Sequence, residues 1–144
     1  MREFDSYIED QDELEEVWAS CISKYEKLWG SEGCDFLSTV PVCIHHKAEE
    51  ANALALTFLS DRGLMVSFNP LITALDSDTY IETVLHEMCH CMAYFDEKTL
   101  AHDEDWYYYV NKLNKNAGYN ITETMGEDQL IDACEESFEF PEFF

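Results

Sequence analysis

The amino-acid sequence predicts a single α+β domain in which helices pack on a small antiparallel β-hairpin or sheet. Apolar residues recur every three or four positions in the segments 12–30, 76–95 and 103–116, which is the periodicity of amphipathic helices. Two short apolar runs between the first and second of these segments flank the turn sequence Ser-Asp-Arg-Gly and indicate a hairpin. The 144 residues are enough for one domain with its own apolar core.

The first helix is expected to begin at the capping residue Asp12 and to end near Gly30 and Gly33. Residues 1–11, which precede it, are interpreted as a short acidic leader. The hairpin pairs Ala53–Leu59 with Leu64–Phe68, and a short strand is expected before it, near Val40–Ile44. The apolar stripe of the first helix consists of Leu14, Val17, Trp18, Cys21, Ile22, Tyr25, Leu28 and Trp29.

The central helix is expected to begin at a cap formed by Asp76, Ser77 or Asp78. The next helix ends at Gly118, and beyond it the sequence predicts a short helix over Leu130–Phe138 and an acidic, phenylalanine-rich tail over residues 139–144. Residues 1–144 are therefore interpreted as one domain. The predicted core-facing residues are Ile81, Val84, Leu85, Met88, Met92 and Phe95 in the central helix, and Trp106, Tyr109, Val110 and Leu113 in the next.

The composition is strongly acidic, because 31 Asp and Glu residues against 8 Lys and Arg residues give a formal net charge of −23. Such a charge repels phosphate backbones, so direct binding to nucleic acid is not expected, whereas cationic proteins and peptides are attracted. A solvated acidic surface that keeps the protein in solution is the simpler explanation of the same composition.

The sequence also carries signals of cellular localisation. The first ten residues, MREFDSYIED, lack the apolar run of a signal peptide, and no segment approaches the roughly 18 uncharged apolar residues of a membrane span. The six cysteines show no paired Cys-x-x-Cys spacing. We therefore expect an intracellular, cytoplasmic protein with reduced thiols and no membrane partner.

Three of the five histidines lie within 17 residues of one another, in the central helix and just after it: His86, His90 and His102. His86 and His90 are one helical turn apart and point roughly 150–190° away from the apolar stripe. They are therefore either exposed to solvent or covered by another part of the chain that completes a site. Two such imidazoles can reach one cation, and Glu87 between them can act on water as a general base.

A zinc site that keeps a position open for water needs a third protein ligand. The extended pattern HExxHxxGxxH is absent, because Ala93 replaces its glycine and Asp96 replaces its third histidine. The candidates are His102 first, at the mouth of the following loop, Glu104 second and Asp96 third. The remaining candidate donors, His45, His46, Cys89 and Cys91, are interpreted as surface or packing residues.

At this point the sequence resembles the SprT-like family of zinc metalloproteases. The stretch GLMVSFNPLITALDSDTYIETVLHEMCHCM resembles the family's strand, its Asn-Pro exit and its acid-capped HExxH helix, and AHDEDWYYYVNKLNKNAGYNIT is similar to the stretch that bears its third histidine. The resemblance implies a compact zincin-like domain whose HExxH helix packs on a following helix that carries this histidine. It also implies zinc (Zn2+) on His86, His90 and His102, with Glu87 as general acid and base.

We therefore expect a zinc-dependent endopeptidase that hydrolyses protein or peptide substrates, basic ones among them, with the outer hairpin strand Leu64–Phe68 aligning the substrate. The alternative is an acidic, nucleic-acid-mimicking binding protein that occupies a basic partner surface, with zinc only structural. Glu87 separates the two, because a structural zinc site has no use for a base. Candidates for assisting roles are Tyr94 and Tyr107–Tyr109 at the oxyanion, and Asp103 or Asp105 behind the imidazoles.

Overall fold

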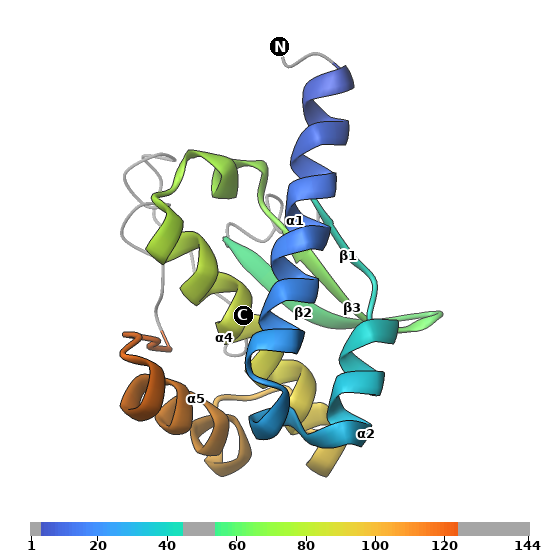
Figure 1. Cartoon of the computed structure of the whole chain (residues 1–144). Coiled ribbons are helices and arrows are strands. Elements are labelled where there is room, and N and C mark those ends of the chain that lie inside the picture. Colours follow the sequence, from blue (N-terminus) through green and yellow to red (C-terminus); the bar gives the residue numbers. More distant parts are fainter. Residues whose placement is uncertain (1–3, 45–53, 124–144) are drawn as a thin grey trace, which may run out of the picture.

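The computed structural model of the chain describes residues 4–44 and 54–123 (Figure 1). The predicted helix Leu130–Phe138, the tail 139–144, Ala53, His45 and His46 lie outside the described residues. The elements follow in the order α1 (Phe4–Lys24), α2 (Glu26–Thr39), β1 (Val42–Ile44), β2 (Ala55–Ser60), β3 (Gly63–Phe68), the 3-10 helix η1 (Pro70–Ala74), α4 (Ser77–Glu97) and α5 (Glu104–Ala117). This arrangement confirms the predicted α+β class.

The first predicted helix is in fact two helices, and it begins earlier than Asp12. α1 begins at Phe4, so residues 4–11, which we interpreted as an acidic leader, belong to this helix. Tyr25 has the non-helical backbone angles φ −114° and ψ 29°, and it separates α1 from α2. The predicted end at Gly30 is a kink inside α2, where φ is 78°. The apolar stripe continues across the junction, so its periodicity carries no sign of the break.

The sheet is mixed, with the strand order β1-β3-β2. β2 and β3 form the predicted antiparallel hairpin, in the register Ala55 opposite Phe68 and Ser60 opposite Gly63. β1 adds to the other side of β3 in parallel, so β3 is the central strand. The prediction that Leu64–Phe68 is the outer strand of the hairpin is therefore wrong, because β1 pairs with its second edge. Among the described strands, β2 is the outer strand of the hairpin.

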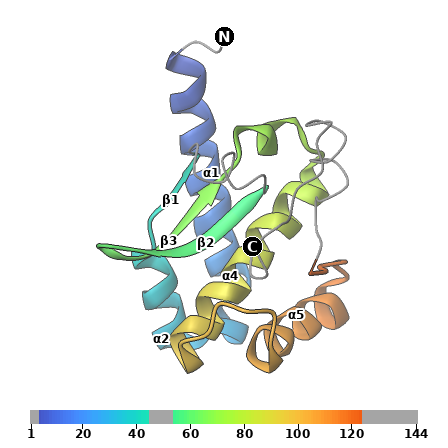
Figure 2. The ribbon, with the colours of Figure 1, turned by 180° about the vertical axis from the view of Figure 1, so that it is seen from behind.

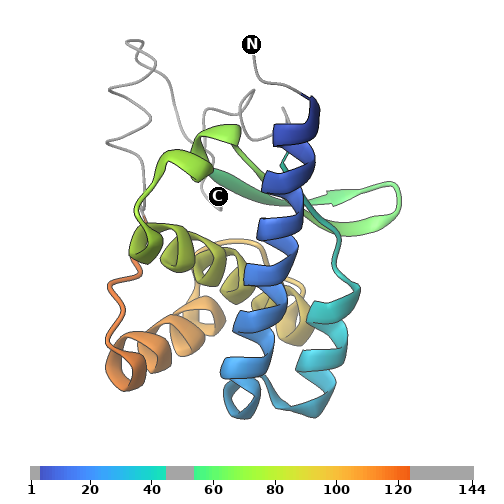
Figure 3. The same cartoon turned by 45° about the horizontal axis from the view of Figure 1, so that its top comes forward.

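α4 is the central helix of the fold. It contacts α5, α2, β2 and α1, and Figure 3 shows it between α5 and the sheet. α1 lies in front of the sheet in Figure 1 and behind it in the reverse view of Figure 2. Side chains are buried all around α4 from Thr83 to Ala93. The helix face that carries His86 and His90 is therefore covered by other parts of the fold. Of the two alternatives in the sequence analysis, exposure to solvent or cover by another part of the chain, the structure has the second.

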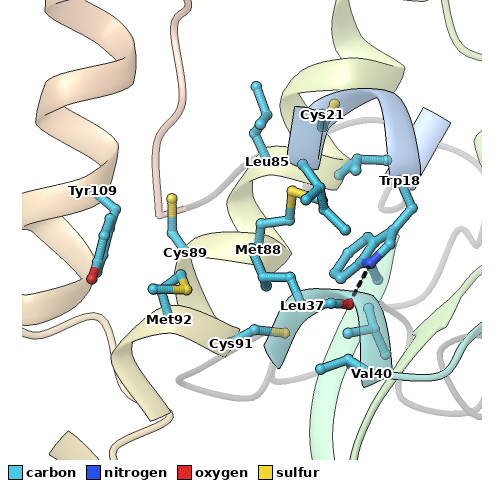
Figure 4. Packing of buried hydrophobic residues seen from close by; sticks show 14 of the residues in the cluster. Trp18, Cys21, Leu37, Val40, Leu85, Met88, Cys89, Cys91, Met92 and Tyr109 are labelled. Carbon is cyan, nitrogen blue, oxygen red and sulfur yellow. Dashed lines mark hydrogen bonds between the residues drawn. The ribbon is translucent and has the colours of Figure 1, made fainter. Parts of the chain in front are cut away.

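The core confirms the packing role that we expected for two cysteines. Cys89 and Cys91 are fully buried, and burial raises the pKa of both thiols well above its ordinary value. In Figure 4, Cys89 lies on the side of α4 that faces Tyr109 of α5. On the other side, Trp18 Nε1 donates a hydrogen bond of 3.0 Å to Leu37 O and so ties α1 to α2.

Local signals set the ends of the two site-bearing helices. Asp76 caps α4, since its Oδ1 accepts from Thr79 N at 2.9 Å. Asp103 caps α5, and Gly118 ends it with a φ of 75°, a left-handed conformation that glycine adopts without steric cost. No helix in the described part of the chain is both long and apolar enough to cross a bilayer.

Candidate metal centre

The structure brings His86, His90 and His102 together. His86 and His90 lie one turn apart on α4, and His102 lies in the loop just before α5. One ligand nitrogen of each ring lies within 4.8 Å of the others, and the Nε2 atoms of His86 and His102 are 3.3 Å apart. Nitrogens that share a tetrahedral zinc ion at 2.0–2.1 Å are about 3.3 Å from each other. The nitrogens therefore need to approach one another by at most about 1.5 Å to reach that geometry.

The other two candidates for a third ligand point elsewhere. Glu104 is exposed in the first turn of α5. Asp96 accepts a hydrogen bond from the hydroxyl of Tyr109. Among the described residues, neither belongs to the group that lies close enough to share an ion with His86.

A hydrogen bond between His86 Nδ1 and the backbone orients the Nε2 lone pair of this imidazole toward His102 Nε2. The carbonyl oxygen of Thr122 can only accept, so at 2.9 Å from His86 Nδ1 it requires a proton on that nitrogen. His102 Nδ1 lies 3.4 Å from Oε1 of Glu123, a carboxylate that likewise accepts. In the neutral His86 ring, Nε2 therefore carries a lone pair, and it lies 3.3 Å from His102 Nε2. A cation bound between them stabilises this arrangement, so the donor set fits a metal ion.

The indole ring of Trp106 packs against the histidine cluster. This fully buried side chain lies against all three imidazoles, with ring centroids 5.0 Å from His86, 5.6 Å from His90 and 4.5 Å from His102. Its Nε1 also donates a hydrogen bond of 3.3 Å to the backbone oxygen of His86. The sequence predicted Trp106 only as a core residue of α5. Its contact with the imidazoles could have been suspected from its position four residues after His102.

Glu87 places a carboxylate beside the histidines. Its side chain is 2 % exposed, and Oε2 lies 3.8 Å from His86 Nε2. Oε1 accepts a hydrogen bond of 2.7 Å from Thr57 Oγ1, which is itself fully buried in β2. Burial raises the pKa of Glu87 to about 8, and the bond from Thr57 lowers it in part. Thr57 contacts this carboxylate through its hydroxyl and its backbone, and so holds it beside the metal-binding face.

A comparison with protein-family models finds the SprT-like family over residues 39–125, which include the sheet, α4, α5 and the three histidines. The chain belongs to the SprT-like family. This confirms the resemblance seen in the sequence. Searches of curated proteins and of solved structures returned no match.

In this SprT-like domain, Asp103 and Asp105 are the acids that we expected behind the imidazoles. Asp103 caps α5, and the pKa of Asp105 is raised by burial and by neighbouring acids. Among the described residues, the carbonyl of Thr122 and the carboxylate of Glu123, both in the segment after α5, contact imidazoles of the cluster. A backbone carbonyl has no side-chain signature, so sequence reasoning had no sign of Thr122.

The tyrosines expected to assist at an oxyanion are engaged in contacts of their own. Tyr94 has the Lys98 ammonium over its ring at 4.8 Å. Tyr109 donates to Asp96, and Tyr107 donates to Oε2 of Glu123. Glu123 connects Tyr107 to the histidines, because Oε1 of the same carboxylate lies 3.4 Å from His102 Nδ1.

Proposed function

We propose that this SprT-like domain is a zinc-dependent endopeptidase, with zinc held by His86, His90 and His102 and with Glu87 as general base. The observation that carries the proposal is the buried Glu87 carboxylate, positioned by Thr57 next to the histidine cluster. Burying a carboxylate is costly, and a purely structural metal site gains nothing from it. The position therefore favours the enzyme over the acidic binding protein.

The donor set supports zinc as the ion. Three neutral imidazoles and one open position are the ligand pattern of catalytic zinc sites. Zinc bound there supplies Lewis acidity, which polarises a substrate carbonyl and makes water easier to deprotonate. The fully buried Trp106 ring lies against the imidazoles and would exclude water from that side of the cluster.

The two oxygens of Glu87 have separate roles. Oε1 is held by Thr57, whereas Oε2 faces the cluster and can accept the proton of the attacking water. The same oxygen then delivers this proton to the leaving amine. A nearby divalent cation favours the ionised carboxylate and so counteracts the burial that raises its pKa. Glu87 can therefore act as a base at neutral pH once the ion is bound.

We further propose that an extended substrate adds as a strand to β2, which is an edge strand among the described strands. β2 contacts α4 and carries Thr57, so a segment paired with it would pass close to Glu87. The net charge of −23 draws cationic substrates to the protein. Unfolded lysine- and arginine-rich proteins are thus the substrate class to test first.

The test compares wild type with Glu87→Gln, using Glu97→Gln as the control, because Glu97 is an exposed glutamate of the same helix. The substrate is a fluorescently labelled, unfolded lysine-rich protein. We expect all three proteins to carry equal zinc, and only Glu87→Gln to lose cleavage, by about 100-fold or more. Cleavage by Glu87→Gln at the wild-type rate, with zinc present, would overturn the proposal and favour the binding protein.

A further inference from the structure

The segment that follows α5 is held to the rest of the fold at each of its residues. We call Tyr119–Glu123 the C-terminal strap. The Tyr119 hydroxyl bonds to that of Tyr25, and Asn120 N donates to Oε2 of Glu82 at 2.6 Å. Ile121 is buried in the core cluster. As described above, Thr122 O contacts His86 and the Glu123 carboxylate contacts His102.

Asn114 of α5 clamps the middle of the strap. Its Nδ2 donates to Ile121 O at 3.0 Å, and its Oδ1 accepts from Ile121 N at 2.9 Å. One side-chain amide therefore satisfies both backbone groups of Ile121, in the way that a neighbouring strand would. The two bonds fix the position and the direction of the peptide chain immediately before Thr122 and Glu123.

We propose that Asn114 is a positioning residue of the metal centre, which acts through the strap on His86 and His102. The proposal rests on the proposed zinc site but concerns a residue that does not touch the histidines. The position of Thr122 O sets the direction of the His86 Nδ1–H bond, and with it the aim of the Nε2 lone pair. The position of Glu123 has the same effect on His102.

Other contacts keep the C-terminal strap bound to the fold without Asn114, so Asn114 affects how accurately the strap is positioned. Without the Asn114 side chain, the bonds at Tyr119 and Asn120 still hold the start of the strap, and Tyr107 still holds Glu123. The backbone at Ile121 then loses its two fixed partners, and the carbonyl of the next residue gains freedom. Loss of a group behind a metal ligand lowers affinity by about 10- to 100-fold, and for one acting a step further away we expect about tenfold.

The experiment measures zinc affinity by competition with a coloured chelator, for wild type, Asn114→Ala and Asn114→Asp. Asn114→Asp keeps the acceptor for Ile121 N but loses the donor to Ile121 O. Asn111→Ala is the control, because Asn111 is exposed on the same helix. The visible absorption of the Co2+ forms reports the ligand geometry, and thermal unfolding of the metal-free proteins reports the fold.

We expect about tenfold weaker zinc binding and an altered Co2+ spectrum for Asn114→Ala, a loss at least as large for Asn114→Asp, whose second carboxylate oxygen faces the acceptor Ile121 O, and no change for Asn111→Ala. Zinc affinity within twofold of wild type in both Asn114 variants would overturn the proposal. So would metal-free variants that fail to fold, since Asn114 would then be a residue of the fold. If the wild type itself bound no zinc, both the proposed function and the proposed role of Asn114 would be wrong. If only the Asn114 variants behaved like wild type, the role of Asn114 alone would be wrong.

Discussion

Replacing Thr57 by valine removes the hydroxyl that holds Glu87 while preserving the shape of a fully buried side chain. The bond is 2.7 Å long, and a hydrogen bond to a charged group contributes about 1.5–3 kcal/mol. If about 1.5–2 kcal/mol of this is lost in the transition state, kcat falls about 10- to 30-fold, because each 1.36 kcal/mol is a factor of ten. The zinc content should not change, since Thr57 contacts Glu87 rather than a histidine.

The pH profile adds an independent readout. Because the bond from Thr57 lowers the pKa of Glu87, its removal raises that pKa, and the acidic limb of the kcat/KM profile should move to higher pH. Thr57→Ser keeps a hydroxyl and should recover most of kcat, with only a small loss of stability from the missing methyl group. A Thr57→Val enzyme with kcat within twofold of wild type and an unmoved acidic limb would refute the assigned role of this bond.

Three further predictions concern the metal and its neighbours. In metal-free protein, burial raises the pKa of Glu87 from 4.5 to about 8, so the stability that this residue contributes is present below pH 4.5 and is lost as pH rises through 8. Urea unfolding should therefore show Glu87→Gln gaining stability over wild type between pH 5 and 8, by up to roughly 1.4 kcal/mol per pH unit. A stability difference that stays constant with pH would contradict this. Removing zinc with a chelator should lower the Tm of wild type, because free zinc at 100 times Kd stabilises the folded protein by about 2.7 kcal/mol, but not the Tm of His102→Ala, which lacks a ligand. Equal Tm shifts in the two proteins would place the zinc elsewhere. Co2+ should quench tryptophan fluorescence through Trp106, whose ring lies 4.5 Å from that of His102, and Trp106→Phe should abolish most of the quenching while leaving Trp18 and Trp29 emission unchanged.

The parts of the fold that the sequence predicted well are those set by neighbouring residues. A cap within residues 76–78, the start of α5 at Asp103 and its end at Gly118 each depend on a short run of chain. The structure has all three, with Asp76 as the cap among the three candidates. The break at Tyr25 was missed for the opposite reason, since tertiary packing sets it while the apolar periodicity continues through it. The same limit applies to the order of the sheet, because the hairpin pattern carries no sign that β1 would add to β3.

The candidate site divides in a similar way. His86 and His90 are a local pattern, and Glu87 lies between them. Ranking His102 above Asp96 and Glu104 followed from its place at the mouth of the loop, and the structure brings its Nε2 to 3.3 Å from that of His86.

The residues that support the site come from distant segments. Thr57 is 30 positions from Glu87, and Thr122 is 36 positions from His86. Asn114 acts on the strap through a peptide group. Such contacts depend on how β2, α4 and α5 pack together, and a threonine in a strand or an asparagine in a helix looks the same in sequence whether or not it has this role.

The central claim, a zinc ion held by three histidines, is tested most directly by elemental analysis of zinc per chain in wild type and His102→Ala, both purified under zinc-replete conditions. The account predicts about one zinc per wild-type chain and far less in the variant, because two imidazoles alone do not complete the site. A wild-type chain without zinc would contradict the account. Equal zinc in the two proteins would also contradict it, since His102 would then not be a ligand.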